Sequence, residues 1–238
     1  MRCRWEQRVG PKTRVQRVLP DNCADVLVFA DGRAVLVGPA TGVEVPALPA
    51  GTLVRGLRFE PHALGAVFGL DAAELTDQTV ALDAVLRPAL ARAVAEAAWG
   101  ADLLGGVAGL GGAAGWLARR WQDVRPDRAT VGIVQALTTP EPALGTGAVR
   151  VETVAERLGF SPRHLRRLIR AETGLTPKTL HRVARLHDFL RRAEAGRLPV
   201  GLAAAAAGYA DQPHASREVR ALTGLSPRQL LAERGAHR

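Results

Sequence analysis

Two stretches in the last third of this 238-residue chain repeat one pattern: a short helix that ends at a glycine, a turn, and a second helix that ends at another glycine. The first stretch runs from Val151 to Pro177 and the second from Val200 to Pro227. The aligned pairs are His164 and His214, Arg167 and Arg217, Ile169 and Val219, Gly174 and Gly224, Leu175 and Leu225, and Pro177 and Pro227. This order of elements is typical of the helix-turn-helix motif. Residues 150–238 are therefore predicted to form an all-α domain with two such motifs.

The net positive charge of the chain lies in the same region as the repeat. Residues 149–238 contain 17 Lys and Arg against 8 Asp and Glu, whereas residues 1–148 contain 15 of each. A basic segment joined to a neutral one is typical of a protein that neutralises nucleic-acid phosphates with one half. Arginines that only decorate solvated helix faces are the alternative interpretation. The coincidence with the repeat favours double-stranded DNA as the partner.

In the first copy, Ser161 is a natural N-cap for the second helix and Pro162 occupies the first helical position. Leu165, Leu168 and Ile169 recur at helical spacing and are expected to face inward. The other side chains lie where a helix in the major groove meets the duplex. The predicted DNA contacts are Ser161, Arg163, His164, Arg166, Arg167 and Arg170. An arginine fork fits a guanine edge and a phosphate, so either partner suits each arginine.

In the second copy, Asp211 is the predicted N-cap of the second helix. The side chains that this helix presents are Gln212, His214, Ser216 and Arg217. A glutamine in the major groove pairs with adenine, and a serine pairs with either strand. Glutamine and serine are also common on solvated helix faces, which is the alternative interpretation. The equivalent positions of the two histidines indicate contacts with the DNA backbone rather than with a metal ion.

The segment between the copies is predicted to be one rigid spacer helix. Its apolar side chains recur at spacings of three and four residues: Leu180, Val183, Leu186, Phe189 and Leu190. A spacer of fixed length would hold the two recognition helices about 34 Å apart, one turn of DNA, in two adjacent major-groove segments of a bent duplex. Lys178, Thr179 and Arg182, at the start of this helix, are predicted phosphate contacts.

The front half is predicted to be α+β, a small antiparallel sheet or partial barrel followed by helices. Strands are expected at 14–19, at 24–39 in a hairpin with a two-residue turn at Asp31-Gly32, and at 52–59. Helices are expected within 61–75, with Asp71 as a cap, and over 81–100, started by Asp83 with Pro88 in its first turns. A short helix at 127–138 follows. The predicted domains are 1–140 and 150–238, joined by a linker at 141–149 that is rich in Pro and Gly.

Other features of the sequence bear on location and assembly. Six glycines dilute the apolar segment 101–123, and the face with Leu110, Trp116, Leu117 and Trp121 is expected to pack on the barrel or on a second subunit. The chain has no uninterrupted apolar run of about 20 residues and no secretory signal, so no membrane partner is expected and the predicted location is the cytoplasm, on the nucleoid. Cys3 and Cys23 are expected to be free thiols.

At both copies, GFSPRHLRRLIRAETGLTP and GYADQPHASREVRALTGLSP, the chain resembles the AraC/XylS family of bacterial transcription regulators. Ile169 and Val219 stand where this family usually has Phe, and Pro213 and Ala215 replace a small polar residue and an aromatic one, which predicts looser packing or altered specificity in the second copy. The front half, with LPDNCADVLVF, GLRFEPHAL and ELTDQTVALD, is similar to the small, distantly cupin-like sensor domains of such proteins. The resemblance implies a homodimer, a small-molecule effector and contacts with RNA polymerase.

Candidate effector-binding residues lie at two places in the front half. Asp21, Cys23 and Asp25 cluster in PDNCAD, where they line a pocket or only form the turn that enters a strand. Arg58 and His62, near a strand end, are candidates for binding an anionic effector. Residues 1–148 contain one histidine, too few for a metal-binding cupin, so no metal, cofactor or enzymatic activity is predicted.

The leading hypothesis is therefore a sequence-specific, effector-responsive transcription regulator. The first alternative is a DNA-repair alkyl acceptor built on the same DNA-binding module, which methyl transfer onto Cys23 would support. The second alternative is a non-specific architectural DNA-binding protein, which would bind selected and random sequences alike across a salt series.

Overall fold

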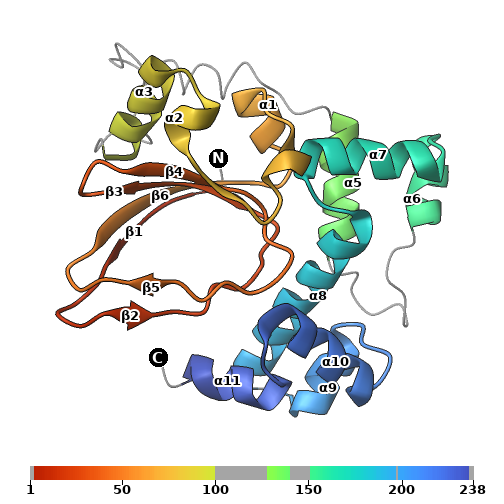
Figure 1. Cartoon of the computed structure of the whole chain (residues 1–238). Helices are drawn as coiled ribbons and strands as arrows, with labels where there is room; N and C mark the ends of the chain where they lie inside the picture. Colours follow the sequence, from red (N-terminus) through yellow and green to blue (C-terminus); the bar gives the residue numbers. More distant parts are fainter. Residues whose placement is uncertain (1–2, 100–127, 140–150, 197, 236–238) are drawn as a thin grey trace.

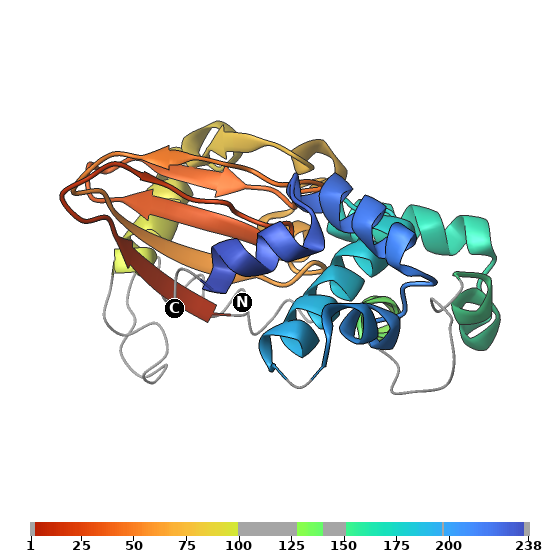
Figure 2. The same ribbon diagram turned by 90° about the horizontal axis from the view of Figure 1, so that it is seen from below.

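The structure, a computed structural model, describes residues 3–99, 128–139, 151–196 and 198–235. The glycine-rich segment with Leu110, Trp116, Leu117 and Trp121 and the linker predicted at 141–149 lie outside the described residues. In two views at right angles, the helices of the back half lie beside one end of the front-half sheet (Figures 1 and 2). Among the described residues, no helix combines the length and the apolar composition that a membrane span requires.

The front half contains an antiparallel sheet of five strands and a separate two-stranded ribbon. The strand order in the sheet is β1 (Cys3–Arg8), β6 (Leu53–Phe59), β3 (Ala24–Phe29), β4 (Ala34–Val37) and β7 (Thr79–Ala81). The ribbon pairs β2 (Arg14–Val15) with β5 (Ala47–Leu48). The predicted α+β fold is confirmed. The strand predicted at 14–19 is shorter, Arg14–Val15, and the strands predicted in the hairpin around Asp31-Gly32 and at 52–59 are present. Sequence reasoning missed β1, a polar strand at the sheet edge, because such a strand lacks a clear apolar alternation.

The hairpin predicted at Asp31-Gly32 joins β3 and β4, but its loop is one residue longer than the two-residue turn expected. The amide of Gly32 donates to the Phe29 carbonyl at 3.0 Å, and the amide of Phe29 donates to the Arg33 carbonyl at 2.8 Å. Gly32 has φ of +89°, a left-handed conformation that glycine adopts without strain. This is the three-residue hairpin loop in which a tight turn is followed by a left-handed residue.

Short helices cover one face of the sheet: α1 (Leu64–Phe68), the 3-10 helix η1 (Ala72–Leu75), α2 (Leu82–Val85) and α3 (Pro88–Trp99) (Figure 1). Asp71 caps η1 as predicted and accepts from the Ala73 amide. The single helix predicted over 81–100 is wrong: it is two helices, because proline disfavours the helical conformation of the residue before it. Pro88 instead begins α3, where its missing N–H costs nothing. Asp83 lies in the first turn of α2, and Ala81 is its N-cap.

The main core of the front half lies between the sheet and these helices. Along β3, Ala24, Val26 and Val28 are buried against this core. The alternate residues Leu27 and Phe29 point to the other face of the sheet, since successive strand side chains alternate. Helices thus cover one face of the sheet, and the other face points toward the β2–β5 ribbon.

The described back half is helical, and its motifs agree with the sequence prediction. Its helices are α5 (Arg128–Thr138), α6 (Val151–Leu158), α7 (Pro162–Thr173), α8 (Pro177–Glu194), α9 (Val200–Ala206), α10 (Gln212–Thr223) and α11 (Pro227–Gly235). Gly159, Gly174, Gly208 and Gly224 all have positive φ, a backbone conformation that ends an α-helix, so the helices of both repeats end at glycines as predicted.

The back half contains two separate hydrophobic cores that share α8. Ile133, Val134 and Leu137 of α5 lie in the first core with α6, α7 and Leu180 of α8. The sequence prediction had assigned α5 to the front domain. The second core combines α9, α10 and α11 with the later part of α8, from Val183 to Leu190. The five predicted spacer-helix side chains are all buried, from Leu180 to Leu190.

Candidate nucleic-acid interface

The two helix-turn-helix units, here the first reading head (α6 and α7) and the second reading head (α9 and α10), position their recognition helices with the same local contacts. Ser161 accepts a hydrogen bond from the His164 amide at the start of α7. Asp211 accepts one from the His214 amide at the start of α10. Each bond satisfies one of the free amides of a helix N-terminus.

The C-terminal ends of the two recognition helices also match. The hydroxyl of Thr173 donates to the Ile169 carbonyl at 2.7 Å and accepts from the Leu175 amide at 3.1 Å. Thr223 repeats both contacts with Val219 and Leu225 at 2.7 and 3.2 Å. Gly174 and Gly224 follow with φ of +74° and +75°. Sequence reasoning did not single out the two threonines, although the repeat register aligns them.

The first recognition helix presents the arginines that the sequence predicted. Arg163, Arg166, Arg167 and Arg170 are all exposed, whereas Leu165 and Ile169 are fully buried. Arg166 forms an exposed ion pair with Glu152 of α6. An exposed pair of this kind contributes little to stability, so it leaves the arginine available to another anion. Ser161 is exposed, but its hydroxyl is used as the cap.

The two predicted histidines contact their own reading heads. The His164 ring packs on Phe160 with a centroid distance of 5.1 Å, and the His214 ring packs on Tyr209 at 5.4 Å. His214 Nδ1 also accepts from the Ala210 amide at 3.2 Å. Both histidines are half-buried in the turn. These contacts hold each ring at the start of its recognition helix, and the predicted contacts of both histidines with the DNA backbone stay predictions.

The second recognition helix presents fewer cations. Gln212 and Arg217 are exposed on α10, and Ser216 is half-buried. Ala215 and Val219, where the sequence departs from the family pattern, are buried within the second core at 2% and 0% exposure. The smaller side chains are therefore accommodated inside the core.

The carboxylate of Glu218, on α10, contacts cationic side chains of α8 and the ring of His214. Arg185 NH2 lies 2.6 Å from Glu218 Oε1, and each side chain is 10% exposed. Arg182, a predicted phosphate contact, places Nε 3.3 Å from Glu218 Oε2, and His214 Nε2 lies 3.7 Å from the same oxygen. The structure thus directs Arg182 toward a protein carboxylate. The corresponding residue in the first reading head is Leu168, which carries no charge.

The start of α8 carries the other two predicted phosphate contacts. Lys178 is exposed. Thr179 is half-buried, and its hydroxyl lies 2.9 Å from that of Thr176, the N-cap of α8. Lys178 is therefore more accessible to a phosphate than Thr179 is.

Sequence reasoning did not include two exposed arginines among the predicted DNA contacts. Arg220 is the counterpart of Arg170, and Arg228, in the first turn of α11, is the counterpart of Lys178. Both are exposed. The repeat register that aligned Gly174 with Gly224 would have found them, because both pairs keep the same spacing.

Three of the five candidate effector residues lie together, and Asp21 and Arg58 also line one cavity. Arg58 forms ion pairs with Asp21 at 2.7 Å and Asp25 at 2.9 Å. Burial opposes the charge of Arg58, but the hydrogen bond and charge of Asp25 and the charge of Asp21 outweigh it and raise the pKa of Arg58. Cys23 and His62 are buried. Burial lowers the pKa of His62, so its neutral form is favoured. In the part of the chain that the structure describes, no group of three or more His, Cys, Asp or Glu side chains could hold a metal ion.

A cavity of about 810 Å³ lies on the face of the sheet that the helices leave uncovered. Its walls include Trp5, Leu27 and Phe29 from the sheet and Gln16 and Glu44 from the ribbon side. Asp25 also lines this cavity, and its carboxylate accepts from Trp5 Nε1 at 3.2 Å. Of the five candidate effector residues, only Asp25 is among those that line this cavity.

Two family models match parts of the chain. Residues 154–233 match the family described as "Helix-turn-helix domain", and residues 1–81 match "Domain of unknown function (DUF6597)". No curated protein sequence matches the chain.

Two solved structures are similar to the chain. The C-terminal domain of AraT, a response regulator from Geobacillus stearothermophilus, is 25% identical and aligns over 46% of this chain and 88% of its own, with a TM-score of 0.41. ToxT from Vibrio cholerae is 9% identical and aligns over 97% of this chain and 96% of its own, with a TM-score of 0.49.

The family match covers the segment on which the sequence resemblance rests. It spans most of both helix-turn-helix units and all of α8 between them. Residues 154–233 therefore form an AraC-type helix-turn-helix domain, which is the DNA-binding type of domain found in transcription regulators.

Proposed function

We propose that the protein binds specific DNA sequences by inserting α7 and α10 into successive major-groove segments of one duplex. The observation that carries this proposal is the pair of identically capped recognition helices attached to one 18-residue helix, α8. An α-helix rises about 1.5 Å per residue, so α8 is about 27 Å long, near the ~34 Å between successive major-groove segments.

The contacts proposed for this complex follow from exposure. They are the exposed cations of α7, of α10 and of the first turns of α8 and α11, together with Gln212: Arg163, Arg166, Arg167, Arg170, Lys178, Gln212, Arg217, Arg220 and Arg228. Those on the first turns of α7 and α10 reach base edges, whereas those near the starts of α8 and α11 contact phosphates. We assign α5 to the DNA-binding half because it packs in the core of the first reading head.

Selection of bound genomic fragments tests the proposal. The selected sequence should bind at least about 10³ times more tightly than random DNA at physiological salt. Arg167→Ala and Arg217→Ala should each weaken binding by about 1 to 3 kcal/mol and relax the sequence preference. Arg87→Ala, an exposed front-half arginine, removes the same charge and should leave binding unchanged.

Two outcomes would contradict the proposal. Equal affinity for selected and random DNA across a salt series would make the protein an architectural DNA-binding protein. Transfer of a methyl group from alkylated DNA to Cys23 would make it a repair protein, although Cys23 is only 4% exposed.

A response to an effector is the finer part of the proposal, and the cavity beside β3 supports it. Its aromatic and aliphatic walls suit an uncharged, mainly apolar molecule. This replaces the anionic effector expected at Arg58 and His62, because Arg58 is already paired with two carboxylates. A thermal-shift screen identifies ligands, and Leu27→Trp, which places a larger side chain in the cavity, should reduce the shift. A shift of unchanged size in Leu27→Trp would place the effector elsewhere.

Assembly and location remain parts of the same proposal. A regulator of this kind acts on the nucleoid in the cytoplasm, as a homodimer that contacts RNA polymerase. Sedimentation of the full chain with and without operator DNA tests the dimer.

A further inference from the structure

The front half contacts both reading heads. Hydrogen bonds and ion pairs from two short segments, 17–22 and 72–76, join it to the back half, and α1 also packs on α7. The heads have separate cores, and among the described residues α8 is the helix that contributes to both. Any further restraint on the angle between the heads must come from outside them. The contacts of the front half supply such a restraint at three places.

The first place is the C-terminal end of α7. The hydroxyl of Thr76 donates to the Gly174 carbonyl at 2.8 Å. The backbones approach so closely that a Cβ on Gly174 would lie 2.4 Å from the Ala72 carbonyl oxygen. The end of the first recognition helix is therefore held directly against η1.

The second place is the corresponding end of α10. Arg17 NH1 donates to the Thr223 carbonyl at 2.9 Å, and Arg17 Nε lies 3.0 Å from Glu233 of α11. A cation at a helix C-terminus interacts favourably with the exposed carbonyls there. Thr223 and Gly174 occupy adjacent positions of the repeat, so the front half holds the same end of both recognition helices.

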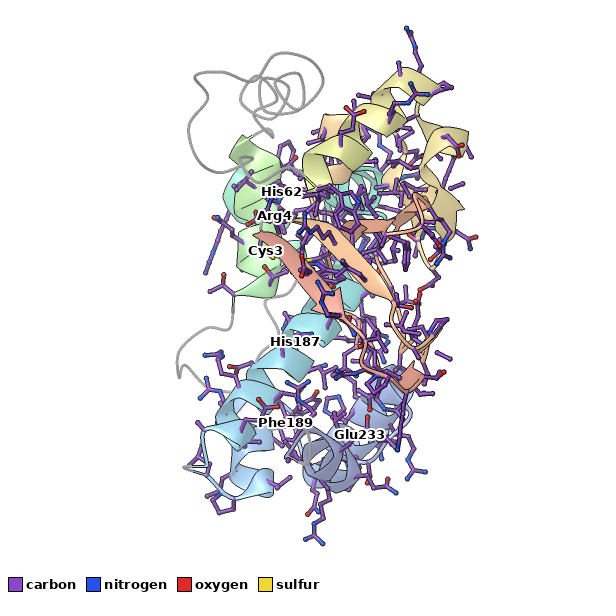
Figure 3. The ribbon with its side chains drawn as sticks, turned by 90° about the vertical axis from the view of Figure 1, so that its left-hand side faces the viewer. Cys3, Arg4, His62, His187, Phe189 and Glu233 are labelled. Carbon is purple, nitrogen blue, oxygen red and sulfur yellow. The ribbon has the colours of Figure 1, made fainter. Side chains whose placement is uncertain are left out.

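The third place lies along α8, between the two ends. Asn22 Nδ2 donates to the Leu180 carbonyl at 3.0 Å, and Asn22 is 4% exposed. His187 Nε2 lies 2.8 Å from the Pro20 carbonyl oxygen, and Leu19 packs against the second core. Figure 3 shows His187 on α8, between Cys3 of β1 and Glu233 of α11. Segment 17–22 thus follows α8 from the second head toward the first.

We propose that Arg17, Asn22 and Thr76 are positioning residues for DNA recognition, through which the front half fixes the angle between the reading heads. This rests on the proposed function. Long helices are rarely straight, and a small bend at α8 swings one head relative to the other. Contacts at both recognition helices and along α8 prevent that bend. The selected spacing between the two half-sites then depends on the front half, although none of its residues touches DNA.

Operators with altered spacing test this inference. Each inserted base pair moves the second half-site by about 3.4 Å and rotates it by about 34°. The full-length parent should prefer one spacing strongly over insertions or deletions of one or two base pairs. The triple variant Arg17→Gln, Asn22→Gly, Thr76→Val removes the three side-chain contacts. Glycine keeps the left-handed backbone of position 22, where φ is +65°.

The triple variant should reduce the preference for the best spacing over a one-base-pair insertion by at least about fivefold, a coupling of the size that links two sites in a protein. Its affinity for DNA with a single half-site should equal that of the parent. Arg14→Gln, an exposed arginine of β2, is the matched control and should keep the parent profile. Thermal melting of each variant reports folding independently.

An unchanged spacing profile in a folded triple variant overturns this inference, as does an equal loss of affinity at every spacing. The proposed function survives both results, because the parent still discriminates between sequences. A parent without sequence preference overturns the proposed function itself.

Discussion

The two reading heads begin and end their recognition helices in the same way but use charge differently. The first head, residues 151–173, has five Arg and three Glu, and its recognition-helix arginines are exposed. The second head, residues 200–223, has two Arg and two acidic residues, and one of these acids, Glu218, binds two arginines of α8. Duplicated backbone geometry therefore does not imply duplicated electrostatics. We expect the first head to supply most of the salt-dependent affinity and the second to add contacts with less long-range attraction.

The largest expected effect concerns Glu218. Glu218→Gln leaves the guanidinium of Arg185, whose side chain is 10% exposed, without its carboxylate and should lower the free energy of unfolding by about 3 kcal/mol. Urea titration measures the loss. The freed Arg182 should also steepen the salt dependence of DNA binding. Glu152→Gln in the first head breaks an exposed pair with Arg166 and should cost less than about 0.5 kcal/mol. Equal costs would mean that the heads do not differ in this respect.

The second largest effect on stability is expected at the glycines that end the two recognition helices, Gly174 and Gly224. Both have positive φ, so alanine at either position is strained by about 1 kcal/mol. Gly174→Ala should cost about 2 kcal/mol or more, because the new Cβ collides with the backbone of Ala72, whereas at Gly224 the nearest atom is Arg17 NH1 at 3.5 Å. Thermal unfolding of the two variants measures the difference. A larger cost at Gly224 would show that the front half does not hold α7 closely.

The N-caps offer a smaller and symmetric test. Ser161→Ala and Asp211→Ala each remove one hydrogen bond to a helix amide and should each lower stability by about 1 kcal/mol. Conservative exchanges, Ser161→Asp and Asp211→Ser, should be nearly neutral. Costs that differ severalfold between the heads would contradict their shared capping geometry.

The smallest effect is the pH response of His181 on α8. Burial, with the charge of Arg185, lowers its pKa below the 6.5 of an exposed histidine. The unfolded chain then takes up the proton first, so stability is lost as the pH falls below about 6.5 toward the folded pKa. His181→Gln should reduce this loss by a fraction of a kcal/mol when melting at pH 7.5 and 5.5 is compared. An unchanged acid response would assign it to other groups, including His62.

The sequence by itself determined the helical back half. Capping residues, helix-ending glycines and apolar spacing act within one or two helical turns, so α6, α7, α8 and α10 begin and end where the local pattern predicts. The same local signals located the β3–β4 hairpin and the cap at Asp71. The sequence also contains the signal for the break before Pro88, because a residue before proline avoids the helical conformation. The prediction of a single helix over 81–100 did not use this signal. The exposed arginines of α7 followed from helical periodicity alone.

Only the tertiary structure decided which charged side chains form ion pairs and where the front half contacts the back half. Arg182 and Glu218 are 36 positions apart, and Asn22 and Leu180 are 158 apart, so no local pattern links them. The polar edge strand β1 forms because β6 offers it backbone partners, which its own sequence does not reveal. Hydrogen bonds and ion pairs between distant segments depend on how the cores pack, and they determine where arginine charge is neutralised and where it stays exposed to solvent.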